Sequence, residues 1–327
     1  MSSTLNINNR RIIVFPNPHH KSLNPYLKDL CQSINAINKE ETSDANIINI
    51  FKHLFDGDVY IFNWPENLFF RKFGYIQIIA LFIGLIILKI RRVKIVWIFH
   101  NISPHQGHTW ITKFIYKIFS RWSNLIITHS QKALKYIEEK TKAKSVFIPH
   151  PFRRKFCLQE ELDYKYDLII WGSIYKYKGI VEFLKSKNTL KTSCKILIIG
   201  KCDDADYDHQ IRTLINKDIT YQNRYVDETE LTSCILSSRY VVFPYLKDSI
   251  SSSGALIDSL LLGKTVIGPN VGAFNELSSM GLCYTFNEYH DIFDIVDSNE
   301  RVSQNLIANF VNENVWDNSA KKMLSYI

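Results

Sequence analysis

The sequence predicts an α/β protein built from two doubly wound, Rossmann-like domains that face a cleft, and three observations support this. Short β-branched apolar runs alternate with longer amphipathic stretches. Runs that are apolar throughout are typical of parallel sheets covered by helices on both faces. The chain has 327 residues, which suits two domains of ordinary size, and its strands are numerous enough for two sheets.

The strands are expected where a short apolar run is bounded by polar or turn-forming residues. In chain order they are Arg11–Phe15, Val59–Phe62, Lys94–Phe99, Leu125–Thr128, Ser145–Ile148, Tyr166–Trp171, Cys194–Ile199, Ile219–Tyr221, Tyr240–Phe243 and Thr265–Gly268. The helices are expected where apolar residues recur at helical spacing. They include Tyr26–Ile37, Gln131–Lys140, Gly179–Ser186, Asp208–Ile215 and Ser253–Leu262.

A domain junction is expected at Pro149-His150-Pro151. The two prolines force extended backbone and end the preceding strand, and a polar, charged stretch follows them. This gives an N-terminal domain of residues 1–150 and a C-terminal domain that begins at residue 151.

The charge and cysteine content narrow the classes of partner and compartment. Lys and Arg outnumber Asp and Glu by 40 to 32, a formal charge of +8, which favours a phosphorylated small molecule or an anionic membrane surface. No RNA-binding signature or zinc-finger spacing is present, so nucleic acid is not expected as a partner. The six cysteines are scattered and the N-terminus is polar, so we expect a cytoplasmic protein with free thiols.

The segment Gly74–Ile90 is almost entirely apolar. It is short for a membrane-spanning helix, which leaves two interpretations. It is either a buried core helix of the first domain or a helix that rests in the membrane interface. The second is favoured by the basic residues beside it, Arg71-Lys72 and Arg91-Arg92-Val93-Lys94.

Polar and aromatic residues follow three expected strands of the first domain. In open α/β sheets, ligands bind beyond the carboxyl ends of the strands. His100 and His105 follow the third strand and are the candidate catalytic residues, because an imidazole activates a hydroxyl or hydrogen-bonds a sugar. The alternative is that they cap the next helix. The residues expected to bind an acceptor are Asn17, His19, Trp64, Glu66 and Asn101.

Two loops of the second domain have the composition of a phosphate site. One follows the first strand and contains Gly172, Ser173 and Lys178, which offer close backbone approach, a hydroxyl and a positive charge. The other follows Tyr240–Phe243 and leads into a helix, where small residues leave amides free for a diphosphate. Its candidates are Tyr245, Ser251, Ser252, Ser253, Gly254 and Asp258, the last for a ribose. A basic turn and a serine N-cap are the simpler alternatives.

No metal site is expected. Asp204-x-Asp206 and Asp206-x-Asp208 resemble the D-x-D metal motif, but they are expected in an acidic loop that is typical of solvated surface. The sequence contains no Walker loop and no G-x-G-x-x-G, H-E-x-x-H or G-x-S-x-G motif.

In this order the segments resemble the GT-B glycosyltransferases, and among them the group-1-like enzymes of exopolysaccharide, capsule and O-antigen synthesis. The resemblance covers most of the chain. The matching segments are Asp58–Glu66, Val96–His105, Gly172–Gly179, Arg224–Leu231, Val241–Tyr245, Ser253–Ile267 and Val271-Gly272 with Glu276, followed by Trp316 and Ala320. Two positions depart from the family pattern: Ile250 stands where the first acid of its paired-acid element is usual, and Gln106 replaces a glutamate. Retaining and inverting chemistry both stay open.

The resemblance implies a metal-independent hexosyltransferase that needs no cofactor. Its C-terminal domain, residues 151–311, would bind a UDP- or GDP-linked sugar, and its last helix, about 312–327, would pack back onto the N-terminal acceptor domain. The acceptor would be a saccharide. The apolar segment Gly74–Ile90 and the net positive charge favour one that is linked to polyprenyl diphosphate, which would place the protein on the cytoplasmic face of the inner membrane. A nucleotide-sugar 2-epimerase of the same fold and a non-catalytic nucleotide-binding relative remain as alternatives.

Overall fold

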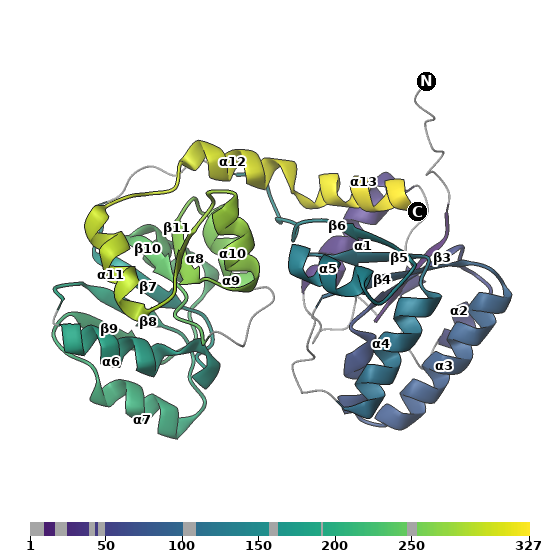
Figure 1. Cartoon of the computed structure of the whole chain (residues 1–327), viewed down its shortest axis with the longest axis horizontal. Coiled ribbons are helices and arrows are strands. Elements are labelled where there is room, and N and C mark those ends of the chain that lie inside the picture. The colour runs from purple at the N-terminus through teal and green to yellow at the C-terminus, as the bar shows by residue number, and fades with distance from the viewer. Residues whose placement is uncertain are drawn as a thin grey trace. The chain divides into compact units, whose positions relative to one another are not determined.

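The computed structural model describes residues 10–16, 25–38, 43–44, 50–100, 109–156, 163–190, 192–246 and 254–327. The chain forms two compact units, Met1–Arg153 with Asn314–Ile327, and Arg154–Glu313. Each unit is a parallel β-sheet flanked by helices (Figure 1). The sequence predicts a domain junction after residue 150 and a C-terminal helix, from about residue 312, that packs on the first domain. In the structure the chain passes into the second unit between residues 153 and 154 and returns to the first between residues 313 and 314.

The first unit contains a six-stranded parallel sheet in the order β2-β1-β3-β4-β5-β6. Its elements are β1 (Ile12–Phe15), α1 (Pro25–Ile37), β2 (Ser43–Asp44), α2 (Ile50–His53), β3 (Val59–Asn63), the 3-10 helix η2 (Pro65–Phe70), α3 (Gly74–Ile90), β4 (Lys94–Phe99), α4 (Trp110–Trp122), β5 (Leu125–Thr128), α5 (Gln131–Glu138), β6 (Lys144–Phe147) and α13 (Trp316–Tyr326). Helices α1 and α13 cover one face, and α2 to α5 cover the other.

Alternate side chains of each central strand enter two different cores. In β4, Val96 and Ile98 pack with α1 and α13, whereas Ile95, Trp97 and Phe99 pack with α3, α4 and α5. Both faces are therefore apolar, which explains why the strand reads as one continuous apolar run. Full burial of an aliphatic or aromatic side chain stabilises the folded state by about 1.5–3 kcal/mol relative to leaving it exposed.

The second unit contains another six-stranded parallel sheet, in the order β12-β11-β10-β7-β8-β9. Its elements are β7 (Tyr166–Trp171), the 3-10 helix η3 (Lys176–Lys178), α6 (Ile180–Leu190), β8 (Ile196–Ile199), α7 (Ala205–Thr213), β9 (Ile219–Gln222), α8 (Glu228–Leu236), β10 (Ser238–Val242), α9 (Gly254–Leu261), β11 (Thr265–Pro269), α10 (Gly272–Ser279), β12 (Tyr284–Phe286), α11 (Tyr289–Ser298) and α12 (Gln304–Glu313). The predicted fold class, two doubly wound parallel-sheet domains, is confirmed.

Helix α3 is neither fully buried nor fully exposed. One stripe, which includes Leu81, Leu85 and Leu88, lies in the core. The opposite stripe is apolar and exposed, and it consists of Tyr75, Ile76, Ile79, Phe82, Ile83, Ile86 and Ile90. Six bulky apolar residues and a tyrosine form an exposed apolar patch on this helix, and its hydration is unfavourable in free energy. This side is therefore a candidate contact surface. We call these seven residues the α3 apolar face.

The basic residues beside α3 have two different roles. Arg91 donates hydrogen bonds to the backbone carbonyls of Leu54 and Phe55, so its guanidinium helps to hold α2 against the domain. Arg71, Lys72 and Arg92 are exposed. No helix of the described ranges is sufficiently long and apolar to span a membrane.

Candidate functional site

The order of each sheet fixes where a ligand site is expected. In the first unit the chain reverses its direction of travel between β1 and β3, and in the second between β7 and β10. Loops leave such a switch point on opposite faces of the sheet and open a crevice at the carboxyl ends of the strands. The residues predicted from sequence lie after β1, β3 and β4 in the first unit and after β7 and β10 in the second.

In the second unit, the loop after β7 folds tightly around two glycines. Gly172 has a φ of 88° and Gly179 a φ of 64°, which favour glycine over any residue with a Cβ. A Cβ at Gly179 would lie 2.2 Å from the carbonyl oxygen of Pro244. Glycine at this position therefore lets the loop after β7 touch the loop after β10.

Further contacts hold these two switch-point loops together. The backbone N–H of Leu246 donates to the carbonyl oxygen of Tyr177 at 3.0 Å. The hydroxyl of Tyr289, at the start of α11, donates to the carbonyl oxygen of Pro244 at 3.1 Å. The rings of Tyr177 and Tyr245 meet edge to face, with centroids 5.9 Å apart. The loops are thus positioned by backbone as well as side-chain contacts.

Lys178 is the buried cation of this arrangement. Only 5% of the residue is exposed, and its ammonium donates to the carbonyl oxygen of Trp171 at 3.4 Å. The same nitrogen lies 5.8 Å from the ring centroid of Tyr245, and a Cβ at Gly172 would lie 3.3 Å from it. Burial lowers the pKa of Lys178 to about 8, because the charged form loses solvation. We call Gly172, Lys178 and Tyr245 the Lys178 cluster.

A cation that has lost its water and gained only one carbonyl oxygen is incompletely compensated. No carboxylate of the described residues pairs with Lys178, although its neighbour Lys176 pairs with Asp204 at 3.0 Å. Among the described residues, the Lys178 ammonium therefore has no anionic partner. Ser173 lies exposed in the same loop.

Helix α9 starts at Gly254 and is tied to β7. The indole N–H of Trp171 donates to the Ser259 hydroxyl at 3.1 Å, and that hydroxyl donates to the carbonyl oxygen of Ala255. Gly254 is exposed, and a Cβ there would meet open space. Asp258, half-buried, lies one turn into the helix.

Several predicted site residues lie outside the described part of the chain, and their roles stay predictions. They are Asn17, His19, Asn101, His105, Ser251, Ser252 and Ser253.

In the first unit, His100 is held by the ends of two neighbouring strands. Its Nε2 lies 3.1 Å from Oδ1 of Asn63, at the end of β3. The Asn63 amide nitrogen donates to the carbonyl oxygen of Phe15, so Oδ1 faces the imidazole. Since an amide oxygen only accepts, Nε2 of His100 carries a proton and donates it to this hydrogen bond. Trp64 stacks on the imidazole with ring centroids 4.2 Å apart.

A second histidine, His129, lies beside His100 and was missed by sequence reasoning. Its Nδ1 lies 2.7 Å from the Ile148 carbonyl oxygen and its Nε2 2.6 Å from the Tyr26 hydroxyl. The carbonyl fixes the proton on Nδ1, so the Tyr26 hydroxyl donates to Nε2. Burial, with a smaller contribution from His150, lowers the pKa of His129 to about 3. The imidazole therefore stays neutral and buttresses the site.

Tyr26 is the centre of this aromatic and histidine cluster. Its ring makes edge-to-face contacts with several rings from distant parts of the unit. They belong to Trp64, His100, His129, His150 and Trp316. The sequence could have predicted His129, because it directly follows β5 as His100 directly follows β4. Nothing in the sequence connects Tyr26 with Trp316.

Glu66 was expected to contact an acceptor, yet its side chain is buried. Only 3% of the residue is exposed, and Oε2 has no hydrogen-bond partner among the described residues. Burial raises the pKa of Glu66 to about 7. Its carboxyl group is thus not presented on the surface of the domain.

The acidic segment was expected to be a loop, but Asp206 and Asp208 lie in the first turn of α7 and Asp204 is the residue that precedes this helix. Two of these carboxylates have structural partners. Asp204 caps α7 by accepting from the Tyr207 backbone N–H. Asp208 accepts hydrogen bonds from Arg212, Tyr221 and Asn223. These contacts account for the two carboxylates as parts of the fold.

Comparison by sequence with protein-family models and with curated proteins finds no match. Solved structures do match. The Anabaena protein HepE, in complex with UDP and glucose, is 12% identical with a TM-score of 0.68, over 98% of this chain and 100% of that one. AviGT4, a glycosyltransferase involved in avilamycin A biosynthesis, is 11% identical with a TM-score of 0.61, over 97% of each chain.

A trehalose-6-phosphate synthase is 10% identical with a TM-score of 0.64, over 97% of this chain and 98% of that one. These similarities extend over almost the whole chain and both of its units. The protein therefore has the GT-B fold of these glycosyltransferases.

Proposed function

We propose that the protein is a glycosyltransferase that moves a sugar from a UDP- or GDP-linked donor to a saccharide acceptor. The observation that carries the proposal is Lys178, a buried ammonium with no carboxylate partner among the described residues, at the switch point of the second sheet. A nucleotide diphosphate supplies the missing anion. Gly172 supports this, because its lack of a Cβ leaves the ammonium approachable.

In the proposed reaction, the bond between the anomeric carbon and the diphosphate oxygen breaks, and its electron pair stays on the diphosphate. Lys178 neutralises the growing negative charge. Positive charges and hydrogen-bond donors that are already in place when negative charge develops commonly make the largest contribution to catalysis. The acceptor oxygen bonds to the anomeric carbon and its proton leaves to a base.

His100 is the proposed base. Asn63 holds the proton on Nε2, so Nδ1 has the lone pair that accepts a proton from the acceptor hydroxyl. Trp64, stacked on the imidazole, limits its rotation and offers an aromatic surface of the kind on which sugar rings pack. A metal ion has no step in this scheme.

We further propose that the acceptor is carried by a membrane lipid, such as a polyprenyl diphosphate, in the synthesis of a surface polysaccharide. The α3 apolar face supports this, because its exposed side chains are flanked by the exposed cations Arg71, Lys72 and Arg92. Apolar insertion combined with attraction to anionic headgroups is how an interfacial helix binds a membrane. The protein would act at the cytoplasmic face of that membrane.

The activity is tested by incubating the protein with UDP- and GDP-sugars in the presence and absence of a membrane lipid extract. We expect nucleoside diphosphate release and a labelled lipid product only when the extract is present. Conversion of a UDP-sugar into its epimer without acceptor would instead assign the epimerase alternative. Binding of no nucleoside diphosphate would refute both.

The membrane contact is tested by sedimentation with anionic vesicles. Ile79→Asp with Ile83→Asp places two charges on the α3 apolar face, where both side chains are exposed, and should abolish binding to vesicles. Leu190→Asp, at an exposed position of the second unit, is the control and should bind as the unmodified protein does. Equal binding by all three proteins would contradict the assignment.

A further inference from the structure

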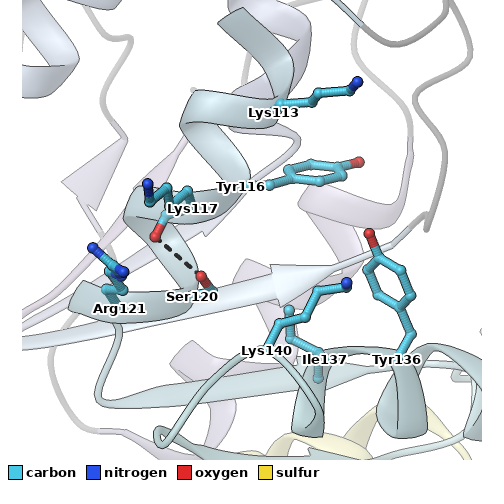
Figure 2. Close-up of a pocket in the computed structure, with 8 residues that line it drawn as sticks. All are labelled: Lys113, Tyr116, Lys117, Ser120, Arg121, Tyr136, Ile137 and Lys140. Carbon is cyan, nitrogen blue, oxygen red and sulfur yellow. Dashed lines mark hydrogen bonds between the residues drawn. The ribbon is translucent and has the colours of Figure 1, made fainter. Parts of the chain in front are cut away.

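A pocket of about 510 Å³ lies between α4 and α5 in the first unit (Figure 2). Its volume falls in the range of small-molecule sites. Its lining comes from the two helices and the turn after α5. None of its residues belongs to the loops that follow the strands, so the pocket is separate from the His100 cluster. The lining residues are Lys113, Tyr116, Lys117, Ser120, Arg121, Tyr136, Ile137 and Lys140.

The pocket is lined by four cations and by no acid. Lys113, Lys117 and Arg121 are spaced four residues apart on α4, and Lys140 approaches from beyond the end of α5. Like charges at this spacing repel one another and destabilise a helix. Within the described ranges, none of the four forms an ion pair with a carboxylate. A bound anion would relieve this repulsion, and the concave wall concentrates the positive field.

Two tyrosines add hydrogen-bonding groups between these cations. Figure 2 shows the side chains of Tyr116 and Tyr136 extending from α4 and α5 into the same space, with the ammonium groups of Lys113 and Lys140 on either side. The Lys140 nitrogen lies 4.6 Å from the Tyr136 ring centroid. Burial, and then the charge of Glu66, raises the pKa of Tyr116, so its hydroxyl keeps its proton.

The surface next to the pocket is apolar. On α4, Trp110 and Phe114 are exposed one stripe away from the three cations. The Phe114 ring lies 6.1 Å from that of Phe82, which belongs to the α3 apolar face. Cations beside exposed aromatic side chains match a ligand whose anionic group is attached to an apolar body or lies at a membrane surface.

We propose that the pocket between α4 and α5 binds a phosphate-bearing ligand, a second anion site separate from the Lys178 cluster of the other unit. Arg and Lys supply charge-assisted hydrogen bonds to phosphate oxygens, and tyrosine hydroxyls complete the set of donors. The phosphate belongs either to a lipid headgroup or to a soluble phosphorylated molecule.

The first arm of the test is calorimetric titration of the full-length protein with inorganic pyrophosphate. Lys117→Ala with Lys140→Ala removes two lining cations. Lys135→Ala with Lys142→Ala removes the same charge from exposed positions outside the lining. We expect the pocket variant to bind roughly 25-fold more weakly, at roughly fivefold for each cation, and the control to bind as before.

A Lys178→Met arm separates this site from the proposed nucleotide site. Pyrophosphate binding that survives Lys178→Met and is weakened by the pocket variant supports the proposal even if the protein binds no nucleotide. Binding that is lost in Lys178→Met and unchanged in the pocket variant overturns it. Equal weakening in the pocket variant and its charge-matched control also overturns it.

The second arm identifies the source of the phosphate with vesicles of phosphatidylcholine, alone or with about a quarter phosphatidylglycerol. For a lipid headgroup, the anionic vesicles bind more tightly, pyrophosphate competes, and the pocket variant loses the difference. For a soluble ligand, the pocket variant changes pyrophosphate binding and leaves vesicle binding unchanged. If neither probe distinguishes the pocket variant from its control, the pocket is not a phosphate site.

Discussion

Replacing Lys178 by methionine should stabilise the protein and remove its nucleotide binding. Burial lowers the Lys178 pKa from its ordinary 10.5 to about 8. Each unit of pKa shift corresponds to about 1.4 kcal/mol, so at pH 7 the buried charge costs about 3 kcal/mol of folding free energy. Methionine is similar in length and fills the site without a charge.

The pH dependence has a defined sign. The folded state favours the neutral amine, so the contribution of Lys178 to stability is complete above pH 10.5 and is lost as the pH falls through 8. The gain from Lys178→Met should therefore be largest below pH 8 and disappear near pH 10.5. Binding of UDP or GDP by the unmodified protein should weaken about tenfold per pH unit above pH 8, because the diphosphate needs the charged form.

Chemical denaturation measures the stability change, followed by tryptophan fluorescence. Trp171 is the one tryptophan in the sequence of the second unit, and its carbonyl accepts from Lys178. Calorimetry with UDP and GDP measures binding. Lys176→Met is the control in the same turn, since the Lys176 side chain is 64% exposed. A Lys178→Met variant that is less stable at pH 7, or that binds nucleotide as tightly as before, would refute the reasoning.

Three further changes have defined outcomes. Glu66→Gln should raise the unfolding free energy by about 3 kcal/mol at pH 8. The Glu66 pKa is raised from 4.5 to about 7, so its contribution is complete below pH 4.5 and is lost as the pH rises through 7; denaturation curves of both proteins from pH 5 to pH 8 check this. Asn63→Ala should lower kcat roughly 10–100-fold through misplacement of His100, with an unchanged donor KM, and steady-state kinetics would contradict the positioning role if KM alone moved. Gly172→Ala should cost about 1–2 kcal/mol of stability, because φ is 88° there, and should weaken UDP binding; unchanged values of both in denaturation and calorimetry would show that neither strain nor crowding matters.

Most of the fold follows from local patterns in the sequence. The strands Lys94–Phe99, Leu125–Thr128 and Tyr166–Trp171 have the predicted bounds, because each contains a short continuous apolar run. The short strand Tyr284–Phe286 was not predicted, since three residues at the edge of a sheet carry almost no periodicity. Helix α3 was predicted from Gly74 to Ile90, but a segment that is almost entirely apolar contains little information on which side is buried.

The candidate site was only partly predictable, for a different reason. His100 directly follows β4 and Lys178 lies in the loop after β7, so the position of the strands was enough to suggest them. Tyr26, His150 and Trp316 reach the same cluster from three helices or loops that are far apart in the chain. Only the sheet order and the return of the last helix bring them together. The burial of Glu66, likewise, depends on packing that no local pattern encodes.

The return of α13 also imposes an order on biosynthesis. Trp316, Ala320, Met323 and Leu324 belong to the core beneath one face of the first sheet. A ribosome releases these residues only after the whole second unit has been translated. The N-terminal unit is thus synthesised first but completes its core last. Until α13 has been synthesised, the apolar surfaces of α1 and of the first sheet that α13 covers stay exposed.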